Sequence, residues 1–255
     1  MTPMILLDKV SLTYHSMQGE THALREINLQ VMPGEFLALV GPSGCGKSTI
    51  CSLVAGLLRP SGGRVLVDGR PVSGVSPKIG YMLQADHLFP WRTIRDNALL
   101  GLEIHKGLTQ DAAARVDRLL ESYGLTPFAR RFPGELSGGM RQRAALIRTL
   151  ATDPDILLLD EPFSALDYQT RLKLADEVKE AIHKAGKTAI LVTHDIGEAI
   201  SMADRVAVLT RRPASVKLQL DMAKLGPDVS PFLRRQHPEF SRYFQTIWKE
   251  LDVHV

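Results

Sequence analysis

The chain alternates short apolar runs with longer segments in which apolar residues recur every three to four positions. Residues 36–40 are apolar throughout, as expected of a strand buried on both faces of a sheet. Pro33 and Gly34 predict a turn just before this strand. Further strands are predicted at residues 5–14, 27–31, 64–67, 78–83, 156–159, 188–192 and 206–209.

Helices are predicted between these strands. Ser137 is a favourable N-cap for a helix that reaches about residue 151. The other predicted helices cover residues 48–58, 93–106, 110–123, 165–185, 196–202 and 238–251. The alternation predicts an α/β domain with a mainly parallel sheet, and the helices of residues 91–151 predict an inserted helical subdomain.

The predicted domain covers residues 1–220, and residues 221–255 are predicted to form a short helical extension. Five apolar residues of the extension have roughly helical spacing and are expected to pack against the domain: Phe232, Phe240, Phe244, Ile247 and Leu251. A regulatory or partner surface is the alternative. The polar, proline-containing stretch after residue 220 sets the boundary.

Composition and charge exclude several classes of protein. The hydrophobic share of 44% is typical of a globular chain, and the net charge of +3, with scattered Lys and Arg, gives no indication of a nucleic-acid partner. Cys45 and Cys51 form no disulfide framework, which favours a reducing, cytosolic setting. The first ten residues resemble a strand more than a signal peptide. Because no apolar stretch approaches the roughly 20 residues that cross a bilayer, a membrane role requires partners.

A phosphate-binding pattern, G-x-x-x-x-G-K-[ST], follows the strand at residues 36–40 and precedes a predicted helix. Its backbone N–H groups and the helix N-terminus suit phosphate binding. Lys47 is expected to reach the β- and γ-phosphates, and the Ser48 hydroxyl to bind Mg²⁺. A glycine-rich turn that matches by chance is the alternative, but the flanking strand and helix argue against it. The loop consists of Gly41, Pro42, Ser43, Gly44, Cys45, Gly46, Lys47, Ser48 and Thr49.

Two carboxylates, Asp160 and Glu161, follow the predicted strand at residues 156–159. In parallel sheets, ligands bind just beyond the carboxyl ends of the strands. One carboxylate suits Mg²⁺ binding, and the other suits accepting a proton from an attacking water. Alone, such a pair is more often a solvated loop, but a phosphate loop in the same chain favours the catalytic interpretation.

The segment of residues 136–143, LSGGMRQR, resembles the signature of ABC transporter ATPases. Ser137, Gly138 and Gly139 lie at a predicted helix N-terminus, which suits anion binding. In that family the signature binds the γ-phosphate of ATP held by the opposite subunit. Met140 stands where the common signature has Gln, so its contacts are in doubt, although little loss is expected.

Other elements of that family follow in the same order. Tyr14 resembles the aromatic residue that stacks on adenine, Gln84 the Q-loop glutamine, Asp167 the end of the D-loop and His194 the switch histidine. Taken singly, Tyr14 could be a surface aromatic, Gln84 a solvated loop residue and His194 a structural cap. The resemblance covers about residues 4–220 and implies a P-loop ABC cassette with a mainly parallel core sheet, an antiparallel β subdomain and a helical subdomain. It assigns catalysis to Glu161, His194, Gln84 and Lys47, and Mg²⁺ binding to Ser48, Gln84 and Asp160.

Three further segments, at residues 88–94, 160–167 and 203–213, resemble the ATPases of nitrate, sulfonate and taurine importers, a group that also serves thiamine precursors. The resemblance implies an ATP- and Mg²⁺-dependent motor on the cytoplasmic face of the membrane. Two copies would pair, drive two permease subunits and depend indirectly on an extracytoplasmic solute-binding protein. The permease contact is expected at residues 85–95, where Phe89 and Trp91 suit docking; core packing is the alternative.

Two other functions are compatible with the same motifs. A soluble ABC ATPase acting on DNA or ribosomes is disfavoured, because only about 90 residues, without sustained heptads, separate Lys47 from Ser137. A scaffold that does not hydrolyse ATP would be expected to lack Glu161 or His194, and both are present. The motifs do not name the solute.

Overall fold

The computed structural model describes residues 2–17, 19–105, 107–227 and 229–251. The described residues leave out 1, 18 and 106 of the predicted domain, the last of which ends the predicted helix at 93–106. They also leave out 228 and 252–255 of the predicted extension. The chain divides into two compact units: a first unit of Met1–Ser76 and Ala175–Val255, and a second unit of Pro77–Leu174. The predicted boundaries of the helical subdomain and the extension stay predictions.

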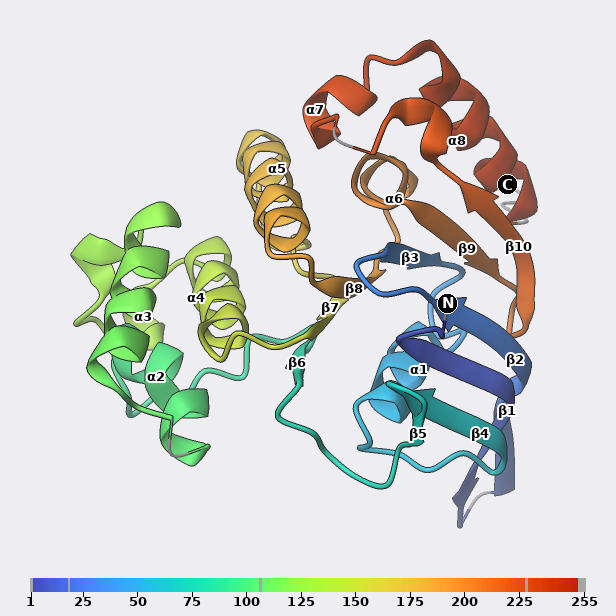
Figure 1. Cartoon of the computed structure of the whole chain (residues 1–255), viewed down its shortest axis with the longest axis horizontal. Coiled ribbons are helices and arrows are strands. Elements are labelled where there is room, and N and C mark those ends of the chain that lie inside the picture. The colour runs from blue at the N-terminus through green and yellow to red at the C-terminus, as the bar shows by residue number, and fades with distance from the viewer. Residues whose placement is uncertain (1, 18, 106, 228, 252–255) are drawn as a thin grey trace. The chain divides into compact units, whose positions relative to one another are not determined.

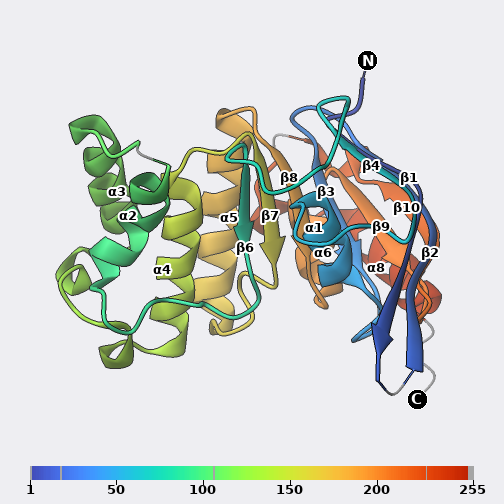
Figure 2. The same ribbon diagram turned by 90° about the horizontal axis from the view of Figure 1, so that it is seen from below.

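The first unit contains an antiparallel sheet, as the family resemblance implies. Its strands are β1 (Ile5–Ser16), β2 (Gly19–Val31), β4 (Gly62–Val67) and β5 (Arg70–Pro71), in the order β2-β1-β4-β5. Figure 2 shows β1 and β2 as a long pair. The prediction of β2 began only at residue 27, because residues 19–22 are exposed and carry no apolar pattern.

The second sheet of this unit carries the strands β10 (Val216–Asp221), β9 (Arg205–Leu209), β3 (Phe36–Val40) and β8 (Thr188–Val192), in that order. β3 pairs in parallel with β8 and β9, and β10 is an antiparallel edge. Every residue of β3 and β8 is buried, as predicted for central parallel strands. Because these three parallel strands point the same way, the segments that follow them meet at one edge of the sheet.

The C-terminal helices cover α6 (Ile196–Met202), whose residues are all buried. α7 (Pro231–Arg234) and α8 (Pro238–Glu250) contact α6, as Figure 1 shows. The guanidinium of Arg234, 1% exposed, donates to the carbonyls of Ala203 and Gly226. The prediction that apolar residues of the extension pack against the domain is confirmed for Ile247, which is fully buried. It is wrong for Phe232, which is 48% exposed.

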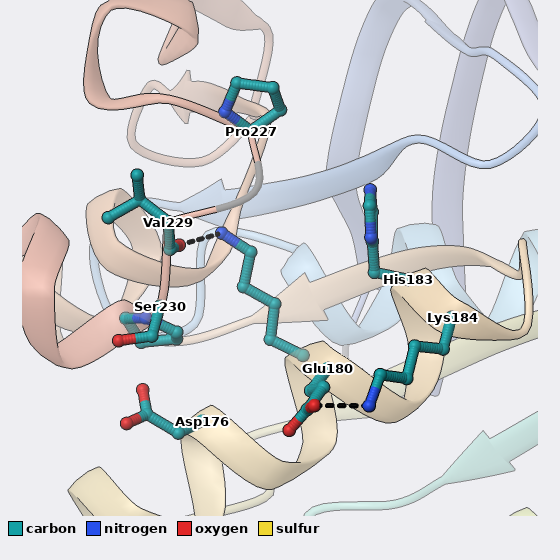
Figure 3. A pocket seen from close by; sticks show the side chains of 9 residues that line it. Asp176, Glu180, His183, Lys184, Pro227, Val229 and Ser230 are labelled. Carbon is teal, nitrogen blue, oxygen red and sulfur yellow. Dashed lines mark hydrogen bonds and ion pairs between the residues drawn. The ribbon is translucent and has the colours of Figure 1, made fainter.

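A pocket of about 420 Å³ lies between the second half of α5 (Tyr168–Lys184) and the start of the extension (Figure 3). The ammonium of Lys179 donates to the carbonyl of Val229 at 3.2 Å, and Lys184 pairs with Glu180. None of the predicted site residues lines it. Lys179 thus joins α5 to the extension, whereas the pair of Lys184 and Glu180 lies within α5.

In the second unit, β6 (Ile79–Met82) pairs in parallel with β7 (Ile156–Asp160). The helices α2 (Ile94–Ile104), α3 (Gln110–Ser122) and α4 (Gly138–Ala151) pack against one another, and α4 also packs against β6 (Figure 1). Thr93, Thr109 and Ser137 cap these helices through their hydroxyls, so the prediction of Ser137 as an N-cap is confirmed. Short 3₁₀ turns occupy η1 (Thr126–Phe128), η2 (Pro133–Glu135) and, in the first unit, η3 (Ala223–Leu225).

Candidate nucleotide site

The phosphate loop leaves the carboxyl end of β3 and enters α1 (Lys47–Val54). Gly44 and Gly46 have φ angles of 69° and 123°, a region that favours glycine. Gly46 caps α1 without a side-chain hydrogen bond, and the first turn of α1 has no acidic residue. A helix N-terminus with neither a side-chain cap nor an acidic residue in its first turn favours an anion.

Lys47 is buried, and its ammonium is held by carbonyls of the phosphate loop. The Nζ atom donates to the carbonyl of Gly41 at 2.8 Å and to that of Pro42 at 3.1 Å. An ammonium has three donors, so these bonds leave one for a phosphate oxygen, as far as the described residues show. The sequence-based role of Lys47 thus fits its position.

Tyr14 and the loop meet in the first unit. The phenol Oη of Tyr14, on β1, lies 3.1 Å from the hydroxyl Oγ1 of Thr49. Tyr14 is 42% exposed, so its ring is accessible for stacking on a base. Ser48, in the first turn of α1, is exposed, as a metal-binding hydroxyl requires.

His194 and Arg212 lie at the same edge of the sheet as the phosphate loop. His194 follows β8, is exposed, and precedes Asp195, which caps α6. The alternative that His194 is the cap is therefore wrong. Arg212 follows β9, and its Nη2 donates to the carbonyl of Gly44 at 2.7 Å. Sequence reasoning missed Arg212, although the parallel order of β3 and β9 would have placed it beside the loop.

In the second unit, the parallel pair β6 and β7 brings Gln84 to the two carboxylates. Asp160 ends β7 and is 3% exposed, with the Tyr81 hydroxyl 3.5 Å from its Oδ2. Gln84 follows β6, and its Nε2 donates to Oε2 of Glu161 at 3.1 Å. The structure thus brings Gln84 and Glu161 together. Gln84 is exposed and lies in a loop, as its alternative interpretation expects, whereas Asp160 is buried.

Glu161 has an unusual backbone that a neighbouring glutamine supports. Its φ angle is 49°, a left-handed conformation that costs a non-glycine residue about 1–2 kcal/mol. Gln142 of α4, 5% exposed, donates to the Glu161 carbonyl at 2.9 Å and to the Ser164 hydroxyl at 3.2 Å. It accepts from the N–H of Ala165 at 2.9 Å. Sequence reasoning missed Gln142, because nothing in its local pattern predicts a tertiary contact.

The signature segment forms the first turn of α4. The Ser137 hydroxyl accepts from the N–H of Met140 at 3.3 Å, so position 140 contributes to this cap through its backbone. Ser137 is exposed, and Gly138 and Gly139 are the first residues of the helix. The segment therefore presents a hydroxyl and backbone donors at one helix end.

One chain thus carries a phosphate loop at the N-terminus of α1, a carboxylate pair after β7 and the signature segment at the N-terminus of α4. A model of the family described as ABC transporter matches residues 24–164. The chain belongs to the ABC transporter family.

Relatives in this family match nearly the whole chain. An uncharacterized ABC transporter ATP-binding protein of Bacillus subtilis is 49% identical, over 96% of this chain and 95% of the relative. The aliphatic sulfonates import ATP-binding protein of Bacillus licheniformis is 41% identical, over 92% and 89%. The taurine import ATP-binding protein of Roseobacter denitrificans is 38% identical, over 92% and 88%. The predicted resemblance to importer ATPases is confirmed.

A solved structure supports the fold and the reaction. A dimeric post-hydrolysis state of the ATP-binding cassette MJ0796, bound to ADP and Pi, is similar with a TM-score of 0.78 and 33% identity. The match covers 86% of this chain and 99% of that one. The predicted ABC cassette fold and ATPase activity are therefore confirmed, and the chain is an ATP-binding ABC ATPase.

Most helices of this ABC ATPase carry an acidic residue at their N-terminus, which neutralises the positive end of the helix dipole. α2, α3, α6 and α8 have one in the first turn. α5 has Asp167 just before it: its Oδ1 accepts from the N–H of Thr170 at 3.0 Å, and the hydrogen bonds from Thr170 lower the pKa of this carboxyl. The prediction that α5 starts at residue 165 is wrong, because residues 162–165 form a turn and α5 begins only at Tyr168, after Asp167. α1, α4 and α7 have no acidic residue in the first turn, but the N–H of Phe232 in α7 donates to Oδ1 of Asp176 at 3.0 Å.

The segment after Gln84 exposes two aromatic rings. Phe89 and Trp91 stack at a centroid distance of 4.9 Å and are 37% and 71% exposed. Core packing is therefore wrong for Trp91, and Phe89 is also partly exposed. Within residues 2–17, 19–105, 107–227 and 229–251, no helix has both the length and the apolarity needed to cross a membrane.

Proposed function

We propose that this ABC ATPase is the motor subunit of an importer. It works on the cytoplasmic face of a membrane, as a pair of copies, with two permease subunits and, indirectly, an extracytoplasmic solute-binding protein. The solute is a small molecule of the nitrate, sulfonate or taurine type, or a thiamine precursor. The sulfonate and taurine import ATP-binding proteins, which match about nine-tenths of this chain, support this choice.

One observation carries the proposal that two copies share each ATP. The N-termini of α1 and α4 lack acidic compensation, and both therefore favour an anion. One ATP has a single terminal phosphate, and the phosphate loop already supplies donors to it. The second anion-binding helix end is then assigned to the ATP of the other copy, in a head-to-tail pair.

The reaction is attack of water on the γ-phosphorus. A bond forms from the water oxygen to phosphorus, the bond to the ADP oxygen breaks, and Glu161 accepts the proton of the water. Lys47 and the N–H groups of α1 bind the phosphate oxygens, and Tyr14 stacks on the adenine. Gln84 orients the water through its bond to Glu161, and His194 contacts the γ-phosphate.

The residues present fit a bound Mg²⁺. Ser48 and Asp160 offer a hydroxyl and a carboxylate, which are hard oxygen ligands, and Gln84 adds an amide oxygen. Among the described residues, no cluster of three or more His, Cys, Asp or Glu side chains could hold a metal. We assign the ion to these side chains together with the nucleotide phosphates, because their oxygen atoms are the ligands that Mg²⁺ prefers. When bound, it neutralises charge that develops on the phosphate oxygens.

Complementation between two inactive variants tests the shared site. Lys47→Ala damages the phosphate loop, and Ser137→Arg damages the signature by bulk and charge. In a heterodimer, one site combines both defects, and the other takes its loop from the Ser137→Arg chain and its signature from the Lys47→Ala chain. Both of those halves are intact.

Mixing the variants should therefore restore occlusion of ATP at one site in each heterodimer. Occlusion is measured as radiolabelled nucleotide retained after rapid gel filtration, because one good site need not sustain turnover. Each variant mixed with itself is the control. No recovery, once subunit exchange has been verified, would overturn the head-to-tail proposal.

A further inference from the structure

One side chain ties the segment after Gln84 to the signature turn. Arg141 lies in the first turn of α4, four residues after Ser137. Its Nε donates to Oδ2 of Asp86 at 3.0 Å, and its Nη1 donates to the carbonyl of Leu136 at 2.9 Å. A single guanidinium therefore bridges Asp86 and the residue that precedes Ser137.

The Asp86 side of this bridge is itself held against α4. The second carboxylate oxygen of Asp86 accepts from the N–H of Leu88 at 3.2 Å, which shapes the local turn. Arg148, two helical turns after Arg141, donates to the carbonyls of Asp86 and His87, both at 2.7 Å. Two arginines on one face of α4 thus fix the backbone of residues 86–88.

The solvent exposure of Arg141 and Asp86 indicates whether their ion pair stabilises the fold or sets a position. The side chains of Arg141 and Asp86 are 36% and 31% exposed, and ion pairs in contact with solvent add little to stability. A planar guanidinium with two acceptors nevertheless fixes direction, which an ammonium would not. The bridge is therefore better suited to setting a position than to holding the fold.

We propose that Arg141 is a positioning residue of the shared ATP site. Through it, the placement of Ser137 depends on the segment that starts at Asp86. The inference rests on the proposed function, in which Ser137 acts on the ATP of the other copy and residues 85–95 meet the permease. A shift of that segment then reaches the signature through Arg141.

The test uses full-length chains that carry Glu161→Gln, so that ATP-bound dimers accumulate. The measurement is the ATP concentration that gives half-maximal dimer, by light scattering after size exclusion. Asp86→Asn and Arg141→Gln should each raise it about three- to tenfold, and the double variant should be no worse than the larger single effect. Nucleotide affinity of the monomer and melting temperature should stay at the parent values.

The matched control is Asp117→Asn, which breaks the Arg95–Asp117 pair of α2 and α3, with exposures of 37% and 53%. It should leave dimer formation unchanged. If the parent forms dimers and neither single variant shifts the ATP requirement, or if the two effects add in full, the inference is overturned. Failure of the Glu161→Gln parent itself to form ATP-bound dimers would overturn the proposed function, and this inference with it.

Discussion

Replacement of Gln142 by leucine should separate catalysis from nucleotide binding. The change keeps the approximate volume of a buried side chain and removes three hydrogen bonds. The Glu161 carbonyl keeps the Ser164 hydroxyl as a donor, and Ser164 and Ala165 are exposed, so water can replace their lost partner. With about 0.5–1.5 kcal/mol for each bond and some gain from the apolar side chain, the expected loss of stability is about 2 kcal/mol.

The kinetic effect follows from the backbone of Glu161. Its left-handed conformation stores about 1–2 kcal/mol, which favours movement of the residue once its carbonyl has lost Gln142 and keeps the Ser164 hydroxyl as its side-chain donor. An energy of that size changes the ratio between two conformations of Glu161 by about 5- to 30-fold. We therefore expect kcat for ATP hydrolysis to fall about 5- to 30-fold, with KM for ATP unchanged because the phosphate loop is intact.

Steady-state ATPase assays and urea denaturation measure the two effects. Thr149→Val is the matched control, because Thr149 is also buried on α4 but donates only to Ala145 of its own helix. It should leave kcat unchanged. If Gln142→Leu lost stability but kept kcat within twofold of the parent, Gln142 would have only a structural role and the reasoning about Glu161 would be refuted.

Three further predictions concern other parts of the site. Glu161→Gln should keep ATP binding, lose most hydrolysis and accumulate ATP-bound dimers in size exclusion; an unchanged turnover would remove Glu161 from the role of base. Tyr14→Ala should raise the Kd for ATP about fivefold, for about 1 kcal/mol of stacking. Tyr14→Phe should leave the Kd for ATP nearly unchanged. If titration calorimetry gave equal losses of affinity for Tyr14→Ala and Tyr14→Phe, the Tyr14 hydroxyl and its contact with Thr49 would matter instead of the ring. Phe89→Ala with Trp91→Ala should uncouple transport in vesicles and spare the ATPase of the isolated subunit, whereas a large drop in melting temperature would indicate packing.

Local sequence signals predicted the elements that carry the chemistry. The phosphate loop, the N-cap at Ser137 and the carboxylates after β7 each depend on a few adjacent residues. The sequence analysis placed Gln84 and Glu161 after two predicted strands but did not pair those strands. The two side chains meet because the segments after two parallel strands share an edge.

The strands, or parts of strands, that the sequence analysis missed are mostly exposed edges. β5 has only two exposed residues, and the first part of β2 is polar. β10 was also missed, although Val216, Leu218 and Leu220 alternate with polar residues as in a strand with one covered face. Gln142 and Arg212 carry no local signal, because their roles depend on which backbone carbonyl the fold brings near. Arg212 could have been placed only from the parallel order of β3 and β9.

α4 connects these parts of the second unit. Its first turn presents Ser137, Gln142 supports the backbone of Glu161, and Arg141 and Arg148 hold residues 86–88. A helix of 14 residues is about 21 Å long and nearly rigid, so these contacts cannot shift independently. A movement imposed at Asp86 therefore changes the position of Ser137 and the support of Glu161 together. In the proposed function, one helix thus links the proposed permease segment with both proposed steps of the ATP cycle, closure on the opposite ATP and its hydrolysis.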